Sequence, residues 1–179
     1  GIDPSEVRVV RGQPTIILEI TGTGDRIDLG WGADPEMAIS EIAFADGTIW
    51  TSTMLVDMAL APTVGDDVIF GTDGAQILTG DAGDDRLIAL GGNDELSGGA
   101  GVDQLEGGEG DDIYRFGAGD GQDRIIDTAG DNDVLELAAG IDPSGVSVEQ
   151  SSDGNAFILR LDGTNDRIRI DNALENGRI

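Results

Sequence analysis

Aspartates recur at a fixed interval in the middle of the chain, where their side chains could bind a metal ion. Between Gly65 and Arg115 the sequence repeats every nine residues, with a glycine, an aspartate two residues later and an aliphatic residue two further on. The recurring aspartates occupy the sixth position of the repeat: Asp67, Asp85, Asp94, Asp103 and Asp112, with Gln76 the exception. The eighth position is apolar throughout: Ile69, Leu78, Leu87, Leu96, Leu105 and Tyr114. One side chain of each repeat is expected to face a cation and the other a core.

The available ligand atoms are oxygens. The chain contains no histidine and no cysteine, so that carboxylates and backbone carbonyls are the ligands on offer. An all-oxygen environment suits a hard cation, and many ligands from flexible loops favour calcium over magnesium. Zinc and copper are poor candidates. The sequence therefore predicts several Ca²⁺ ions.

A short fixed period predicts an array of identical units, each a glycine-rich turn followed by a very short strand. Glycines permit turns with positive φ whose carbonyls point inward. If two units make one coil, equivalent loops are eighteen residues apart, and Asp67, Asp85 and Asp103 stack on one another. At a spacing of roughly 4.8 Å and an effective dielectric near 20, each stacked pair repels by about 3 to 4 kcal/mol. A bound cation would turn that repulsion into attraction.

Three other interpretations compete with this one. A stretch rich in glycine and aspartate can be a flexible acidic linker, but the strict register of the repeat argues against it. An EF-hand requires a central glycine and a glutamate at loop position twelve, which GDNDVLEL and DAGDDRLI lack. The segment GAGDGQD has the glycines of a phosphate-binding loop, yet its aspartates would repel phosphate.

The run resembles the nonapeptide G-G-x-G-x-D-x-U-x of RTX (repeats-in-toxin) proteins, a calcium-binding parallel β-helix repeat. The resemblance covers about a third of the chain. It implies a parallel β-roll in which calcium lies between loops eighteen residues apart. One loop supplies the carbonyls of positions two and four and its aspartate, and the next supplies the carbonyls of positions one and three and its aspartate.

Transferred by position, the resemblance implies three clear calcium sites. Their residues are Thr63, Gly65 and Asp67 with Gly80, Ala82 and Asp85; Asp81, Gly83 and Asp85 with Gly98, Ala100 and Asp103; and Leu90, Gly92 and Asp94 with Gly107, Glu109 and Asp112. The site that contains Gln76 is expected to be weak or empty. Past Arg115 the register slips by two residues, and Asp123 and Asp133 are expected to complete two terminal sites.

A longer repeat flanks the nonapeptides, because GIDPSEVRVV at the start returns as GIDPSGVSVE from Gly140. Alternating apolar residues in both copies predict half-buried strands joined by hairpins, and TSTMLVDMAL predicts a short helix near 52–60 capped by Thr51 or Ser52. We therefore expect an all-β fold: a parallel β-roll over 62–138 between mainly antiparallel β capping modules over 1–61 and 139–179. The second module is an incomplete copy of the first.

Charge and composition limit the possible functions. The 179 residues carry a formal charge of −26, and all ten basic residues are arginine. This charge excludes nucleic acid as a partner and disfavours anionic membranes, and no apolar stretch is long enough for a membrane-spanning segment. Without histidine, cysteine or lysine most catalytic schemes lose their usual groups, so we expect no enzyme. A minor alternative is calcium-dependent self-cleavage at an Asp-Pro bond, at Asp3, Asp34 or Asp142.

The flanking segments resemble the haemolysin-type calcium-binding-related module, which often ends in DGTxW, here DGTIW. This resemblance implies a calcium-binding module that folds in the extracellular medium as part of a larger secreted or cell-surface bacterial protein. Its partners would be calcium, neighbouring modules of the same protein and a type I secretion apparatus. The alternative is an adhesion or glycan-binding module with the roll as a calcium-rigidified spacer; an exposed Trp31 or Trp50 would favour it.

Overall fold

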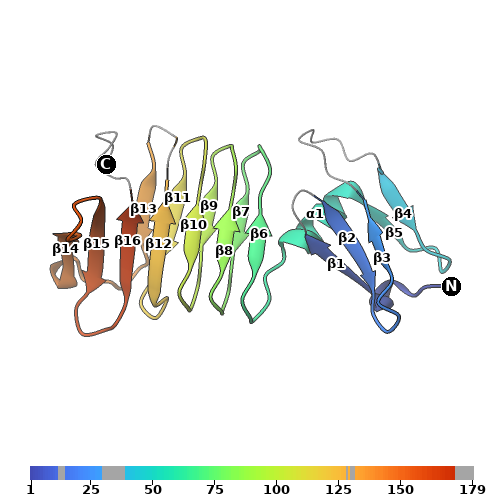
Figure 1. Cartoon of the computed structure of the whole chain (residues 1–179), viewed down its shortest axis with the longest axis horizontal. Helices are drawn as coiled ribbons and strands as arrows, with labels where there is room; N and C mark the ends of the chain where they lie inside the picture. The colour runs from blue at the N-terminus through green and yellow to red at the C-terminus, as the bar shows by residue number, and fades with distance from the viewer. Residues whose placement is uncertain (12–14, 30–38, 128, 130–131, 172–179) are drawn as a thin grey trace. The chain divides into compact units, whose positions relative to one another are not determined.

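The computed structural model describes residues 1–11, 15–29, 39–127, 129 and 132–171, which belong to two compact units, Gly1–Ala61 and Pro62–Ile179 (Figure 1). Each unit consists mainly of β-strands with its own buried side chains. Within the described residues, no helix has both the length and the apolar character needed to cross a membrane.

The first unit combines a small antiparallel sheet, a hairpin and a helix. Strands β1 (Val7–Arg11), β2 (Ile16–Ile20) and β3 (Arg26–Asp28) form the sheet, and β4 (Glu41–Ala43) and β5 (Ile49–Thr51) form the hairpin. Helix α1 (Ser52–Leu60) follows directly, and the Thr51 hydroxyl accepts a hydrogen bond from the Met54 N–H. The short helix and its threonine cap, both predicted from the sequence, are confirmed.

The core of this unit consists of buried residues from the strands and the helix, including one tryptophan. Ile16, Leu18, Leu29, Trp50 and Leu55 are buried together. The ring of Phe44 meets Trp50 edge-on, with 4.7 Å between centroids. Trp50 is therefore a core residue, whereas Trp31 lies outside the described residues.

The second unit contains the predicted roll. Its strands are β6 (Val68–Phe70), β7 (Ile77–Thr79), β8 (Arg86–Ile88), β9 (Glu95–Ser97), β10 (Gln104–Glu106), β11 (Ile113–Phe116), β12 (Gln122–Ile126) and β13 (Val134–Leu137). Successive strands alternate between two parallel sheets, one holding β6, β8, β10 and β12 and the other β7, β9, β11 and β13. Ile69 pairs with Leu87, and Leu87 with Leu105, so two nonapeptides make one coil. The parallel β-roll is confirmed.

The interior of the roll consists of the side chains at position eight. Leu78, Leu87, Leu96 and Leu105 are fully buried, and Ile69 and Tyr114 nearly so. Each coil contributes only two such side chains, one from each sheet. Phe70, Ile88, Ala89 and Phe116 are buried as well, but the hydrophobic core remains narrow, which limits the apolar area that folding can bury.

The register changes at the end of the repeats. Leu105 pairs with Ile125, twenty residues on, as the predicted slip of two requires. On the other sheet Tyr114 pairs with Leu135, twenty-one residues on, so this coil holds one inserted residue more than expected. The pairing continues because the extra residues lie between strands.

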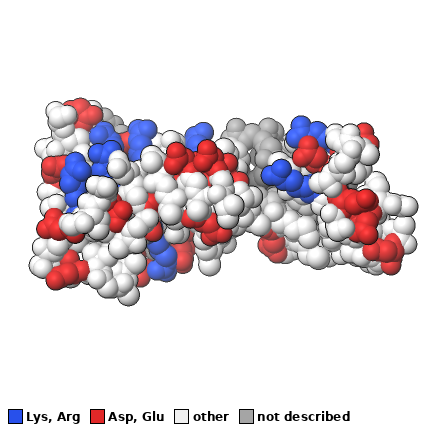
Figure 2. Space-filling view, turned by 90° about the horizontal axis from the view of Figure 1, so that it is seen from below, with Lys and Arg blue, Asp and Glu red and all other residues white. Residues whose placement is uncertain are grey.

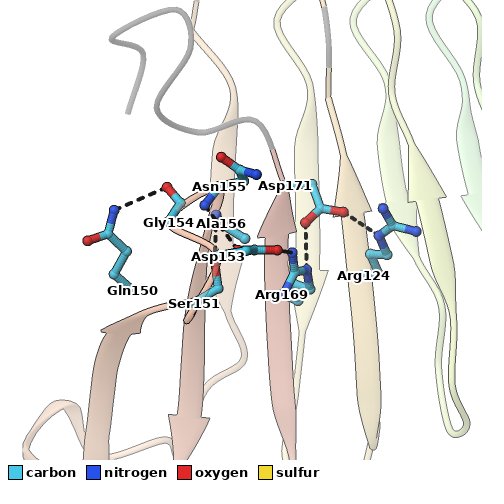
Figure 3. Close-up of polar contacts among 9 residues, drawn as sticks. All are labelled: Arg124, Gln150, Ser151, Asp153, Gly154, Asn155, Ala156, Arg169 and Asp171. Atoms are coloured by element: carbon cyan, nitrogen blue, oxygen red, sulfur yellow. Dashed lines mark hydrogen bonds and ion pairs between the residues drawn. The ribbon is translucent and has the colours of Figure 1, made fainter.

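The C-terminal strands extend one sheet of the roll. Strands β14 (Val146–Gln150), β15 (Ala156–Leu161) and β16 (Arg167–Asp171) are antiparallel, while β16 pairs in parallel with β12. The result is a seven-stranded sheet with the order β14-β15-β16-β12-β10-β8-β6. Asp171, largely buried, pairs with Arg124 of β12 and with Arg169, which also contacts Asp153 (Figure 3). These strands cover an edge of the roll that would otherwise expose unpaired backbone groups.

The turns between strands bring the coils so close that side chains are excluded. A Cβ atom built on Gly101 would lie 1.9 Å from the carbonyl oxygen of Gly83 in the preceding coil. At position two Gly99 and Gly108 have positive φ, and so do two residues with side chains: Asp81 has φ 70° and Leu90 has φ 80°. Both are strained relative to glycine.

Replacing Leu90 by glycine should therefore stabilise the second unit. We expect Leu90→Gly to raise the free energy of unfolding by about 1 kcal/mol, because glycine adopts the left-handed conformation without the steric cost of a Cβ. Urea denaturation in calcium measures it. Leu90→Ala is the matched control, since it removes the same side chain but keeps the Cβ. Equal stability of both variants would contradict a strained turn.

Candidate metal sites

The position-six aspartates form a ladder that runs along each side of the roll. The Oδ1 atom of each carboxylate accepts the backbone N–H of the position-six residue in the preceding coil. The distances are 2.7 Å from Asp67 N to Asp85, 2.8 Å from Asp85 N to Asp103, 2.8 Å from Gln76 N to Asp94 and 2.8 Å from Asp94 N to Asp112. The structure thus brings together the aspartates that the sequence paired eighteen residues apart.

The second oxygen of these carboxylates has no partner. The Oδ2 atoms of Asp85, Asp94, Asp103 and Asp112 are buried and, within the described residues, accept no hydrogen bond. Leaving a charged oxygen buried and unpaired costs several kcal/mol, so such atoms call for a ligand. Cations fit this arrangement because ions bound between successive coils on each side of the roll would satisfy these oxygens, and the available ligand atoms are oxygens, as calcium prefers.

The loops close tightly around these oxygens. A Cβ atom on Gly98 would lie 2.2 Å from Asp103 Oδ2, and one on Gly107 would lie 2.1 Å from Asp112 Oδ2. In these repeats position one therefore stays free of a side chain next to the unpaired oxygen, whereas the repeat of Asp94 has Ala89 there. Gly80 has the same relation to Asp85 Oδ2, at 2.3 Å.

The carbonyls expected to bind calcium lie where neighbouring coils face each other. Asp81 O accepts the Ala100 N–H at 2.9 Å, and Ala100 O accepts the Gly83 N–H at 3.0 Å. On the opposite side Leu90 O accepts the Glu109 N–H at 3.0 Å, and Glu109 O accepts the Gly92 N–H at 2.8 Å. A carbonyl oxygen has two lone pairs, so each retains the capacity to bind a cation.

Burial raises the pKa values of the ladder carboxyls. Desolvation is the largest cause at Asp94 and Asp103, where the pKa rises to about 6, and at Asp123, where it rises to about 8. The pKa values of Asp85 and Asp112 are raised for the same reason. The neighbouring aspartates add to the increase, and hydrogen bonds from backbone amides oppose it. Without a cation these groups hold protons more tightly than ordinary aspartates do.

The first coil differs from the others. Asp67 Oδ2 accepts the Thr63 N–H at 2.7 Å, and the side-chain oxygen of Gln76 accepts the Thr72 N–H at the same distance. Both oxygens are therefore satisfied by the chain itself. In the predicted site of Thr63, Gly65 and Asp67, only the partner carboxylate of Asp85 offers an unpaired buried oxygen.

The last coil contains a ligand candidate that the sequence analysis missed. Asp123 and Asp133 accept the N–H groups of Asp103 and Asp112 at 3.1 and 3.0 Å, as expected. In addition, carboxylate oxygens of Asp112, Asp127 and Asp133 lie within 4.8 Å of one another. The Tyr114 hydroxyl donates to Asp127 Oδ2 at 2.7 Å and accepts the Gly107 N–H at 2.9 Å.

Asp127 lies outside the nonapeptide register, so periodicity gave no reason to include it. The one sequence signal was Tyr114, which replaces the usual aliphatic residue at position eight and brings a hydroxyl to the interior. The three carboxylates make this end of the roll a further candidate site.

Family comparisons agree with this geometry. The family model described as the RTX calcium-binding nonapeptide repeat (4 copies) matches residues 63–96, 79–114 and 88–123. The model of the haemolysin-type calcium binding protein related domain matches residues 16–54. The nonapeptides of this chain are calcium-binding RTX repeats, and the predicted resemblance of the N-terminal segment to the haemolysin-type calcium-binding-related module is confirmed over residues 16–54.

Two similar solved structures are solution structures of repeat subunits from the Azotobacter vinelandii mannuronan C5-epimerase. The AlgE6R3 subunit is 29% identical over 63% of this chain and 74% of its own, with a TM-score of 0.48. The AlgE6R2 subunit is 30% identical over 63% of this chain and 84% of its own, with a TM-score of 0.41. A search of curated proteins found no match.

Removing a ladder carboxylate should weaken calcium binding. We expect Asp103→Ala to raise the calcium concentration at half-saturation by roughly tenfold or more, because it removes a charge-assisted acceptor of the Asp85 N–H and a ligand oxygen. Isothermal titration calorimetry measures the effect. Gln76→Ala is the control, since it removes no charge. Similar shifts for both variants would speak against the ladder as the metal site.

Low pH should weaken calcium binding, and it should also stabilise the metal-free fold in part. A raised carboxyl pKa stabilises the metal-free fold fully below about pH 3.8, and this contribution is lost as the pH rises through about 6 at Asp94 and Asp103 and about 8 at Asp123. We therefore expect metal-stripped protein to have more β-structure at pH 5 than at pH 8. Calcium must also displace these protons, so its midpoint should be higher at pH 5. Circular dichroism at both pH values tests this, and identical midpoints would contradict it.

Proposed function

Since the chain belongs to the family of RTX calcium-binding nonapeptide-repeat proteins, we propose that it is a calcium-responsive folding module of a larger secreted protein. In this proposal the roll is largely unfolded when calcium is scarce and forms once ions occupy its loops. The ions bind between the position-six carboxylates and the loop carbonyls of successive coils.

The observation that carries the proposal is the set of four buried Oδ2 atoms without hydrogen-bond partners. Between Asp66 and Asp133 the chain has eighteen acidic residues and three arginines, Arg86, Arg115 and Arg124. Folding without cations would bury unpaired charge next to like charge, and the narrow core offers little apolar area to offset it. Calcium removes the penalty, so its binding free energy becomes folding free energy.

Cooperativity follows from the ladder. Asp85 and Asp103 each contact the coil before through Oδ1, and the backbone N–H of each contacts the coil after. An ion at one pair of loops therefore orders a residue that belongs to the next pair as well. We expect dissociation constants of roughly 10⁻⁴ to 10⁻³ M, as in other extracellular calcium modules. With such values the sites would be empty in a low-calcium cytoplasm and occupied in the medium outside.

Export in an unfolded state is consistent with this mechanism. A low-calcium compartment would keep the repeats expanded through carboxylate repulsion, and the extracellular medium would fold them. We place the protein outside the cell or on the cell surface, after type I secretion, by analogy with the RTX family. The C-terminal strands β14, β15 and β16 would close one edge of the roll as it forms.

Two alternatives gain no support from the described residues. A glycan-binding module was expected to expose tryptophan, but Trp50 is buried against Phe44. The Asp-Pro bonds at Asp3 and Asp142 begin single 3-10 turns, in which the aspartate accepts the N–H of Ser5 or Ser144 at 2.9 Å. Hydrogen bonds from the Ser5 hydroxyl and N–H lower the pKa of Asp3, and those from the Ser144 N–H and hydroxyl lower the pKa of Asp142. These aspartates thus have local structural roles, and Asp34 lies outside the described residues.

A calcium titration followed by circular dichroism tests the proposed function. We expect metal-free protein to gain β-structure in one cooperative transition on addition of calcium. Magnesium should act far more weakly, because it requires near-ideal octahedral geometry and gives up water reluctantly. Sodium chloride at matched ionic strength controls for simple screening of the carboxylates. Equal β-structure in excess chelator and in calcium would overturn the proposal.

A further inference from the structure

The side chains at position five form a second ladder, beside the calcium ladder and running the opposite way. Asp66 Oδ1 accepts the backbone N–H of Asp84, and Asp84 Oδ1 accepts the N–H of Val102, both at 2.9 Å. On the other side of the roll Asn93 Oδ1 accepts the N–H of Asp111 at 3.1 Å. Each acceptor thus holds the position-five amide of the following coil, eighteen residues on.

Where both ladders have an acceptor, they tie a loop to both of its neighbours. At the Asp84–Asp85 step, the N–H of Asp84 is held by Asp66 of the coil before, and the N–H of Asp85 by Asp103 of the coil after. The same opposition occurs at the Asp111–Asp112 step, where Asn93 and Asp133 are the acceptors. Adjacent residues therefore fix the distance of a loop from the coils above and below.

The two ladders differ in exposure and in what remains for a cation. The carboxylates of Asp85, Asp94, Asp103 and Asp112 at position six are buried and keep one unpaired oxygen. The position-five side chains of Asp66, Asp84, Asn93 and Asp111 are exposed to solvent. Acidic side chains form several separate groups on the surface in the view of Figure 2, with basic side chains beside some of them. An exposed position-five side chain can hold a loop in place without occupying the ion position.

The position-five residues also vary in charge, and two copies lack an acceptor. Asp66, Asp84 and Asp111 are acidic, Asn93 is neutral with the same acceptor oxygen, and Ala75 and Val102 have no side-chain acceptor. An aspartate at this position stands next in sequence to a ligand aspartate, so its charge attracts the same cation. Hydrogen bonding and charge can therefore be separated by substitution.

From this geometry we infer that the position-five side chains are positioning residues of the calcium sites: their acceptor oxygens set the spacing of successive loops, and their charges adjust calcium affinity. The inference rests on the proposed calcium-dependent folding and adds residues outside the ligand set. Neutral Asn93 and charged Asp84 perform the same spacing task. They differ in the charge that they place beside the ion.

The test is a calcium titration of the whole chain and four variants, followed by calorimetry and circular dichroism. Asp84→Ala loses the acceptor and the charge, and we expect the calcium midpoint to rise about fivefold, as the loss of one hydrogen bond implies. Asp84→Asn loses only the charge, and a rise of about twofold is expected. Asn93→Asp gains a charge and should lower the midpoint.

Ionic strength separates the two contributions. The difference between the parent chain and Asp84→Asn should shrink as sodium chloride is raised, because exposed charges are screened. The difference between Asp84→Asn and Asp84→Ala should persist, since it reflects a hydrogen bond. If the position-five side chains only stabilised the fold, the two differences would not respond differently to salt.

Ala75→Asn supplies a gain-of-function variant that does not depend on a destabilised fold. The new amide oxygen would stand where it can accept the N–H of Asn93 in the next coil, and the calcium midpoint should fall. If all these variants match the parent while calcium still folds the chain, the inference is wrong and the proposed function stands. If the parent itself does not respond to calcium, both are wrong.

Discussion

The structure depends on one unfavourable feature, a stack of buried carboxylates each with an oxygen that nothing in the described chain satisfies. Asp85, Asp94, Asp103 and Asp112 use one oxygen to hold the preceding coil and leave the other unpaired. In most folds such an arrangement would be removed, because burying an unpaired charge costs more than a hydrogen bond returns. In our proposal the same arrangement makes folding depend on a cation. The hydrophobic core of the roll is narrow, so apolar burial offers little to offset that cost.

Different positions of the nonapeptide have separate tasks. Position eight fills the interior, position six bridges coils and faces the ion in our proposal, and most copies of positions one and four are glycines that leave room for oxygens. Position five spaces the loops from outside in our proposal. Beyond the repeats, β16 continues the sheet past β12 and Asp171 ties the two strands through Arg124. A roll with these parts needs little apolar surface, which is consistent with a chain that stays unfolded until ions arrive.

The sequence predicted the features that repeat and the one helix with a local capping signal, and missed the contacts that have neither a period nor a local signal. The nine-residue period was enough for the eighteen-residue register, the inward leucines and the pairing of Asp85 with Asp103, because each follows from the geometry of a coil. The preference of threonine for the N-cap position indicated that a helix begins after Thr51. The pairing of β16 with β12 joins segments more than forty residues apart and carries no periodic signal. Asp127 was not predicted for the same reason. The hydrogen bond from Thr63 to Asp67 was not predicted because it comes from a backbone amide, whose position the residue types do not reveal.

The most direct test of the central claim is a crystal structure at saturating calcium, with anomalous scattering used to locate the ions. The account predicts calcium between successive loops, bound by the Oδ2 atoms of Asp85, Asp94, Asp103 and Asp112. Vacant loops at saturating calcium, with these oxygens still unpaired, would contradict it.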